Sequence, residues 1–128
     1  MRLHDYIRST ARTPFALGQH DCATFATGWV LAATGRDISQ GLAGRYRTYA
    51  GGLRQVRKLG YEDHVALIAA HLLERASLVD AVIGDIVVVQ GEDGLALGIC
   101  AGDHAQVLTE RGVGAVDMAQ VLRAFEVR

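Results

Sequence analysis

The sequence of 128 residues has little of what marks a secreted, membrane-spanning or nucleic-acid-binding protein. Its first residues lack the apolar core of a secretory signal, and no later stretch approaches the ~20 apolar residues of a membrane span. The densest basic segment, residues 54–58, is typical of the solvated face of a helix, and the formal net charge is -1. We therefore expect a soluble protein made in the cytoplasm, without a membrane span and without nucleic acid among its partners.

Cysteine is scarce as well, since Cys22 and Cys100 are the only two. In a chain without a leader, two thiols are more often free than paired, so no disulfide is expected. His64 and His71 flank a predicted helix, and neither has a second ligand residue at a spacing suited to zinc. We expect neither a metal nor another cofactor.

Apolar residues are plentiful: half of the chain is hydrophobic and 21% is charged. This balance favours a well-packed globular protein over a disordered one. A chain of this length can bury a core without disulfide or metal support. We expect a single domain over residues 1–128.

The N-terminal half carries helical patterns. Apolar residues within 3–7 indicate a short helix that ends before Pro14, the only proline. Asp21 is a suitable N-cap and Gly35 a suitable stop, which together predict a helix over residues 22–34. Further helices are predicted over residues 51–59 and 65–73.

From Gly84 onward the pattern changes to short β-type runs separated by glycine-containing turns. The predicted strands cover residues 85–90, 95–101, 104–109, 112–116 and 122–127. Turns such as Gly91-Glu92-Asp93-Gly94 indicate antiparallel hairpins, and residues 118–120 make the last crossing. Helices followed by strands predict an α+β fold, with helix 22–34 packed centrally on an antiparallel sheet of about five strands.

Cys22 stands at the predicted start of that helix, where unpaired backbone N–H groups favour the thiolate. Cysteine peptidases place their nucleophile in this way. Cys22 also lies on or beside the apolar stripe that contains Ala26 and Trp29, and burial without a partner would raise its pKa. Two interpretations stay open: an activated nucleophile, or inert packing.

Residues 42–49 form a polar connector that can line a groove. Its aromatic and basic side chains are Arg45, Tyr46, Arg47 and Tyr49. Rings and guanidinium forks suit sugars or carboxylates, but they also pack well as supports for an irregular segment. We take Arg45 and Tyr46, together with Asp21, as candidate binding residues, although Asp21 is also expected to act as a helix cap.

Three segments resemble the NlpC-type peptidoglycan cysteine peptidases, which have a papain-like fold. Asp-Cys-Ala-Thr-Phe at residues 21–25 resembles their Asp-Cys-Ser-Gly-Leu motif, and residues 84–89 resemble their Gly-Asp-Leu-Val-Phe-Phe strand. Residues 96–103 are similar to the next strand of these enzymes, His-Val-Gly-Ile-Tyr-Leu-Gly-Asn, in the same order. The resemblance implies an NlpC-like papain fold with Cys22 at the position of the nucleophile.

A wider set of segments resembles a family of small phage and prophage proteins encoded among tail genes. Members are described as NlpC-like, and related peptidases accompany tail-tip proteins of long-tailed phages and gene transfer agents. The resemblance implies a tail-tip or baseplate component of the virion, whose partners are other tail-tip or hub proteins and peptidoglycan. The matching segments are residues 14–15, 18–25, 35–37, 44–46, 84–85 and 96–99.

The resemblance places Ala96 where these peptidases carry their catalytic histidine. Alanine cannot accept the thiol proton, and general acid–base assistance is typically worth about 10²–10⁴-fold in rate. We therefore expect a catalytically degenerate protein that serves tail assembly or cell-wall contact. One alternative is an active peptidase that cleaves peptidoglycan stem peptides, with Cys22 as nucleophile. One candidate base is His20, if the approach loop, residues 14–20, folds back onto Cys22. The other is His104, if the register of its hairpin shifts. A host-encoded wall-binding module is the further alternative.

Overall fold

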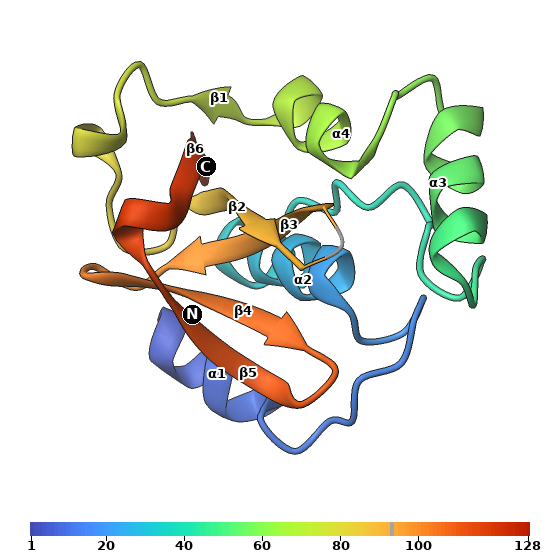
Figure 1. The fold of residues 1–128 in the computed structure, drawn as a ribbon, viewed down its shortest axis with the longest axis horizontal. Helices are drawn as coiled ribbons and strands as arrows, with labels where there is room; N and C mark the ends of the chain where they lie inside the picture. Colours follow the sequence, from blue (N-terminus) through green and yellow to red (C-terminus); the bar gives the residue numbers. More distant parts are fainter. Residues whose placement is uncertain (93) are drawn as a thin grey trace.

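The computed structural model describes residues 1–92 and 94–128, and within them the chain is α+β, as predicted (Figure 1). Four α-helices precede most of one six-stranded antiparallel sheet. The helices are α1 (Leu3–Thr10), α2 (Cys22–Thr34), α3 (Tyr49–Lys58) and α4 (His64–His71). The strands are β1 (Leu73–Glu74), β2 (Ile86–Gly91), β3 (Gly94–Cys100), β4 (His104–Thr109), β5 (Gly112–Asp117) and β6 (Val121–Glu126). Two 3₁₀ turns complete the chain, η1 (Leu78–Asp80) and η2 (Met118–Gln120).

The strands are arranged in the order β1-β6-β2-β3-β4-β5. β5 and β6 lie on opposite sides of the β2–β3–β4 meander, although only η2 joins them. The sheet therefore has to curl, so that the end of β5 comes back towards β6 (Figure 1). A register shift between Val88 and Val89, where β2 pairs with β6, adds local twist to this curl.

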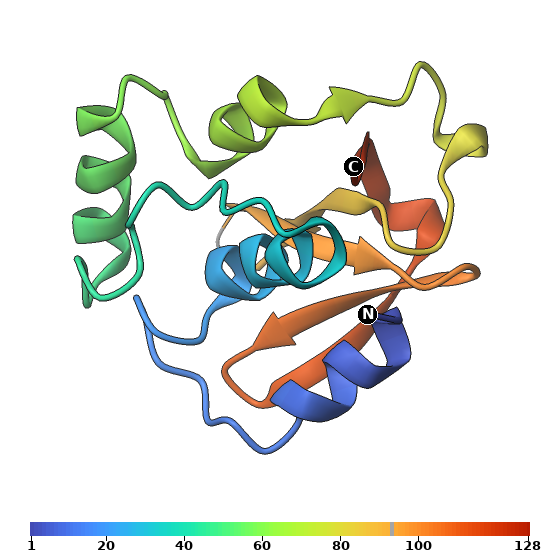
Figure 2. The ribbon, with the colours of Figure 1, turned by 180° about the vertical axis from the view of Figure 1, so that it is seen from behind.

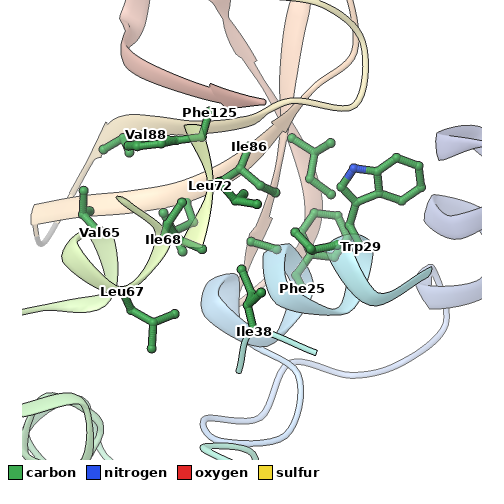
Figure 3. Close-up of a cluster of buried hydrophobic side chains, with 14 of the residues drawn as sticks. Phe25, Trp29, Ile38, Val65, Leu67, Ile68, Leu72, Ile86, Val88 and Phe125 are labelled. Carbon is green, nitrogen blue, oxygen red and sulfur yellow. The ribbon is translucent and has the colours of Figure 1, made fainter. Parts of the chain in front are cut away.

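The two faces of the sheet bury different clusters, because successive side chains of a strand point to opposite faces. The helix-side cluster packs against α2 and α4 (Figure 3) and receives from the sheet Ile86, Val88, Leu97, Ile99, Leu108 and Phe125. The inner cluster consists of Val87, Val89, Cys100, Ala105, Val107, Val121 and Ala124. The residues of this cluster come from strands alone, and Ala81 after η1 and Met118 of η2 pack against it, so its burial results from the curl of the sheet and from these two short segments.

α2 packs on the sheet through the helix-side cluster, and its predicted bounds are confirmed. It begins with a capping box: Thr24 N–H donates to Asp21 Oδ1 (2.9 Å), and Asp21 N–H donates to Thr24 Oγ1 (2.8 Å). It ends at Gly35, whose φ of 78° lies in the left-handed region. Near this end Trp29 Nε1 donates to the carbonyl of Gly84 (2.7 Å), which fixes the helix to the start of β2.

Other boundaries differ from the prediction for local reasons. α3 begins at Tyr49 instead of residue 51, because Thr48 Oγ1 accepts from Gly51 N–H and caps the helix earlier. α4 ends at His71 instead of residue 73, because Leu73 and Glu74 pair with β6 as β1. Within the predicted turn 91–94, Asp93 lies outside the described residues.

Tyr6 ties α1 to α2 inside the core. Its hydroxyl donates to the Phe25 carbonyl (2.6 Å), and its ring centroid lies 5.6 Å from those of Phe25 and Trp29. Burial raises the pKa of this phenol to about 12, against 10.0 for an exposed tyrosine. The folded protein therefore holds the phenolic proton more tightly than the unfolded chain does.

This difference predicts a loss of stability in alkali. Between pH 10 and pH 12 the unfolded chain releases most of the Tyr6 proton while the folded protein largely keeps it, so the free energy of unfolding falls by about 2 kcal/mol. Urea unfolding from pH 9 to pH 12 measures the fall, and Tyr6→Phe should remove this part of it. Burial also raises the pKa of Tyr46, so Tyr46 contributes its own part of the fall, and Tyr6→Phe should remove only the part that belongs to Tyr6. An unchanged pH dependence in Tyr6→Phe would contradict the assignment.

Candidate functional site

Cys22 is the first residue of α2, and its thiol lies against β3. Burial raises the pKa of the Cys22 thiol, and the nearby charge of Asp21 adds to the rise. Backbone N–H groups of Leu97, Ala23 and Cys22 hydrogen-bond to the sulfur and act in the opposite direction, but burial has the larger effect. The thiol is therefore protonated at neutral pH, in the way of a packed cysteine.

Asp21, beside this thiol, is a structural residue whose carboxylate accepts three hydrogen bonds. Thr24 N–H donates to Oδ1 (2.9 Å), while Gly18 N–H (2.8 Å) and the Tyr46 hydroxyl (2.6 Å) donate to Oδ2. Only 5% of the residue is exposed. The predicted cap is confirmed, and because these internal donors occupy both oxygens, the carboxylate is not presented to a ligand.

The same contacts join two loops into what we call the Asp21 junction, made of Gly18, Asp21, Gly44 and Tyr46. Gly44 N–H donates to the Gly18 carbonyl (2.7 Å), so the approach loop and the connector run against each other. Gly18 has a φ of 82°, and a Cβ built on it would lie 2.0 Å from the Tyr46 carbonyl oxygen. The Tyr46 ring also packs on Gly52 of α3, so the junction fixes that helix as well.

His20 is close to Cys22 in the sequence, but its ring is packed as part of the core. It contacts Phe25 edge-on, with ring centroids 6.4 Å apart, and its backbone pairs with Ala16. Burial lowers the pKa of His20 more than Asp21 raises it, so the imidazole is neutral. Nε2 is buried, and the described residues offer it no hydrogen-bond partner.

His104 is far from Cys22. It begins β4, with Nδ1 2.6 Å from Asp103 Oδ1 and Nε2 2.7 Å from the Gln106 amide. Its carbonyl accepts from Ala101 N–H, four residues beyond Leu97 on β3, which is about 13 Å along the strand. The register that would bring His104 to the thiol is not the one the sheet adopts.

Position 96 is not opposite Cys22 either, which corrects the expectation drawn from the resemblance. Ala96 pairs with Val89 and packs against the inner cluster, on the sheet face away from α2. Leu97 pairs with Val88 and belongs to the helix-side cluster. The β3 residue directed at the cysteine helix is therefore Leu97, which has no group that can take a proton.

A second feature adjoins the Asp21 junction, where the connector meets the first turns of α3. It is a hollow of about 310 Å³. Figure 2 shows the connector running up beside α3 at one end of the molecule. We call it the arginine hollow; it is lined by Gly44, Arg45, Tyr46, Arg47, Thr48, Gly51, Arg54 and Gln55.

Two of the three candidate binding residues, Arg45 and Tyr46, line the arginine hollow, whereas Asp21 is turned into the junction. The sequence did not indicate Arg54 and Gln55 as partners of the connector, because they belong to the following helix. The signal was their helical spacing from Gly51, which puts Arg54 on the same side of α3 one turn later.

His64 and His71 make other contacts. His64 Nε2 lies 3.1 Å from the Leu95 carbonyl oxygen, and His71 Nε2 lies 3.2 Å from the Tyr61 hydroxyl. Residues 1–92 and 94–128 contain no group of three or more His, Cys, Asp or Glu placed to hold a metal ion. None of the helices in this part of the chain is long and apolar enough to cross a membrane.

Together, these features define an α+β protein with a buried cysteine at a capped helix start and an arginine-lined hollow nearby. The model of the family described as "Domain of unknown function (DUF6950)" matches residues 1–127, and the chain belongs to that family. No curated protein matches the chain.

Proposed function

We propose that this chain is a phage or prophage tail-tip or baseplate component, built on an NlpC-like papain scaffold that no longer hydrolyses peptidoglycan. The proposal rests chiefly on the environment of Cys22. Its thiol is covered by β3, its pKa is raised by burial, and the β3 residue directed at its helix is Leu97. A cysteine peptidase requires a thiolate and an imidazole in contact at this place.

The layout supports the scaffold part of the proposal. A cysteine begins a helix that packs on an antiparallel sheet later in the chain, which is the order used by papain-like enzymes. A general base is typically worth about 10²–10⁴-fold, and a protonated thiol loses further reactivity. The protein then acts through binding, with its surface in contact with neighbouring tail proteins or with the cell wall.

An active peptidase is the second candidate, because one observation favours it. Backbone N–H groups of Leu97, Ala23 and Cys22 lower the pKa of the Cys22 thiol, which acts in favour of a thiolate nucleophile. His20 lies two residues away with an unpartnered Nε2 among the described residues, and it would have to leave Phe25 to reach the thiol. Cleavage would then fall on peptide bonds of peptidoglycan stems.

Alkylation separates the two candidates. We expect iodoacetamide at pH 7.5 to label Cys22 more slowly in the folded protein than in urea, since burial raises the pKa of the thiol and so lowers the thiolate fraction. The rate is measured in Cys100→Ala, which leaves the half-buried Cys22 as the single cysteine, with Cys22→Ala as the matched control. Labelling that is faster in the folded protein than in urea would establish an activated thiol and favour the peptidase.

Function is tested in a phage or prophage that encodes the chain. Deleting the gene should stop production of complete, infective tails, and Cys22→Ala should restore them, because the thiol does no chemistry. Purified wild-type protein should release no muropeptides from cell walls. Release that is lost in Cys22→Ala would establish the peptidase. Normal tails after deletion, with wall-fragment binding that survives Cys22→Ala, would instead indicate a wall-binding module outside the tail.

A further inference from the structure

The charges of the arginine hollow are left open to solvent. Three arginines outside the hollow form ion pairs: Arg75 with Asp85 (2.9 Å), Arg123 with Glu74 (2.7 Å) and Arg128 with Glu126 (2.6 Å). None of the arginines of the hollow is paired with a carboxylate of the described residues. They are Arg45, Arg47 and Arg54.

Three arginine residues line the hollow, and its lining contains no acidic residue. Arg54 is held over the first turn of α3, with Nη2 3.8 Å from the Cβ position of Gly51. The N-terminus of α3 adds partial positive charge at the same place. Like charges gathered in this way repel one another, and a bound anion removes the repulsion.

We propose that the arginine hollow binds a dianionic phosphate group, either free or as a monoester. A carboxylate carries one negative charge and would leave two of the three guanidinium groups without compensation. A phosphate carries up to two charges at neutral pH, and its oxygens accept the paired N–H donors of a guanidinium fork.

The shape of the site agrees with this ligand. Its volume of about 310 Å³ is at the lower end of small-molecule sites, which span about 300–1,000 Å³. The hollow therefore has room for a phosphate and part of the group esterified to it. Thr48 and Gln55 supply further polar atoms to the lining, and the Tyr46 ring supplies an apolar wall.

The site does not depend on the proposed function, because Cys22 takes no part in it, and phosphate binding should be unchanged in Cys22→Ala. The test is titration of the folded protein with inorganic phosphate and with glycerol phosphate, followed by amide chemical shifts at constant ionic strength. Acetate and sodium chloride are titrated in parallel. Saturable shifts confined to residues 44–55 are expected with both phosphates, and weaker ones with acetate.

Three variants, Arg45→Gln, Arg47→Gln and Arg54→Gln, should each weaken phosphate binding by about tenfold or more, since each removes a charged hydrogen-bond donor. The three side chains are exposed, so the variants are expected to fold, which the spectra verify directly. Arg111→Gln, an exposed arginine in the β4–β5 turn, is the matched control and should bind normally.

The outcomes are distinct. Glycerol phosphate binding more tightly than inorganic phosphate supports a monoester as the ligand, and equal or weaker binding supports the free anion. Absence of saturation, acetate binding as tightly as phosphate, or an equal loss in Arg111→Gln would each overturn the proposal.

Discussion

Gly18→Ala is expected to destabilise the protein by about 4 kcal/mol or more, which is an exceptional cost for adding one methyl group. At Gly18 the new Cβ would lie 2.0 Å from the Tyr46 carbonyl oxygen, and the φ of 82° is already unfavourable for alanine. The connector segment around Tyr46 therefore has to move away from Gly18. That movement breaks the hydrogen bond from Gly44 to Gly18 and displaces the Tyr46 hydroxyl from Asp21.

Gly35→Ala is the matched control, because Gly35 has nearly the same backbone conformation, with a φ of 78°, and open space around its Cβ position. It should cost only the conformational penalty, about 1–2 kcal/mol. Urea denaturation of both variants measures the difference. Equal losses at the two positions would show that backbone conformation alone, and not the close approach of the connector, requires glycine at position 18.

Asp21→Ala is expected to lower the free energy of unfolding by about 3–5 kcal/mol, well above the ~1 kcal/mol of an ordinary helix cap. The change removes the cap of α2 and leaves Gly18 N–H and the Tyr46 hydroxyl without their acceptor. Buried donors that lose a charged acceptor account for the excess. Thermal or urea unfolding, followed by circular dichroism, measures it.

Asp63→Ala is the control for this variant. Asp63 caps α4 by accepting from Ala66 N–H (2.8 Å), and its carboxylate accepts no other hydrogen bond among the described residues. Its loss should cost about 1 kcal/mol. Tyr46→Phe alone should lower the free energy of unfolding by part of the amount lost in Asp21→Ala. In the double variant the two losses should not be additive. Similar losses of unfolding free energy in Asp21→Ala and Asp63→Ala would show that Asp21 stabilises the protein only as a helix cap.

Features with local signals were predicted well from the sequence. The bounds of α2 follow from Asp21 and Gly35, and β4 follows from the turns on either side of it. β1 was missed because it has two residues, and its partner, β6, is about fifty residues away. Pairing with so distant a strand ended α4 earlier than its own apolar pattern indicated.

In the candidate site, too, features with local sequence signals were predicted and features that depend on distant residues were not. The position of Cys22 and the capping role of Asp21 depend on neighbouring residues, and both were predicted. The hydrogen bond between Asp21 and Tyr46 joins loops 25 residues apart, and no pattern within either loop indicates it. The orientation of position 96 depends on strand register, where a slip of one residue moves a side chain to the other face. That is why the expected base position proved to face the inner cluster.

The strand order has a consequence for the route by which this sheet forms. β1 and β2 are close in the sequence, but β6 lies between them in the sheet. Until residues 121–126 arrive, one edge of β2 is unpaired, and β1 is the nearest strand-forming segment able to occupy it. Because β1 has only two residues, a pairing between β1 and β2 has few hydrogen bonds and dissociates readily. The brevity of β1 thus keeps the edge of β2 available to its slower, long-range partner.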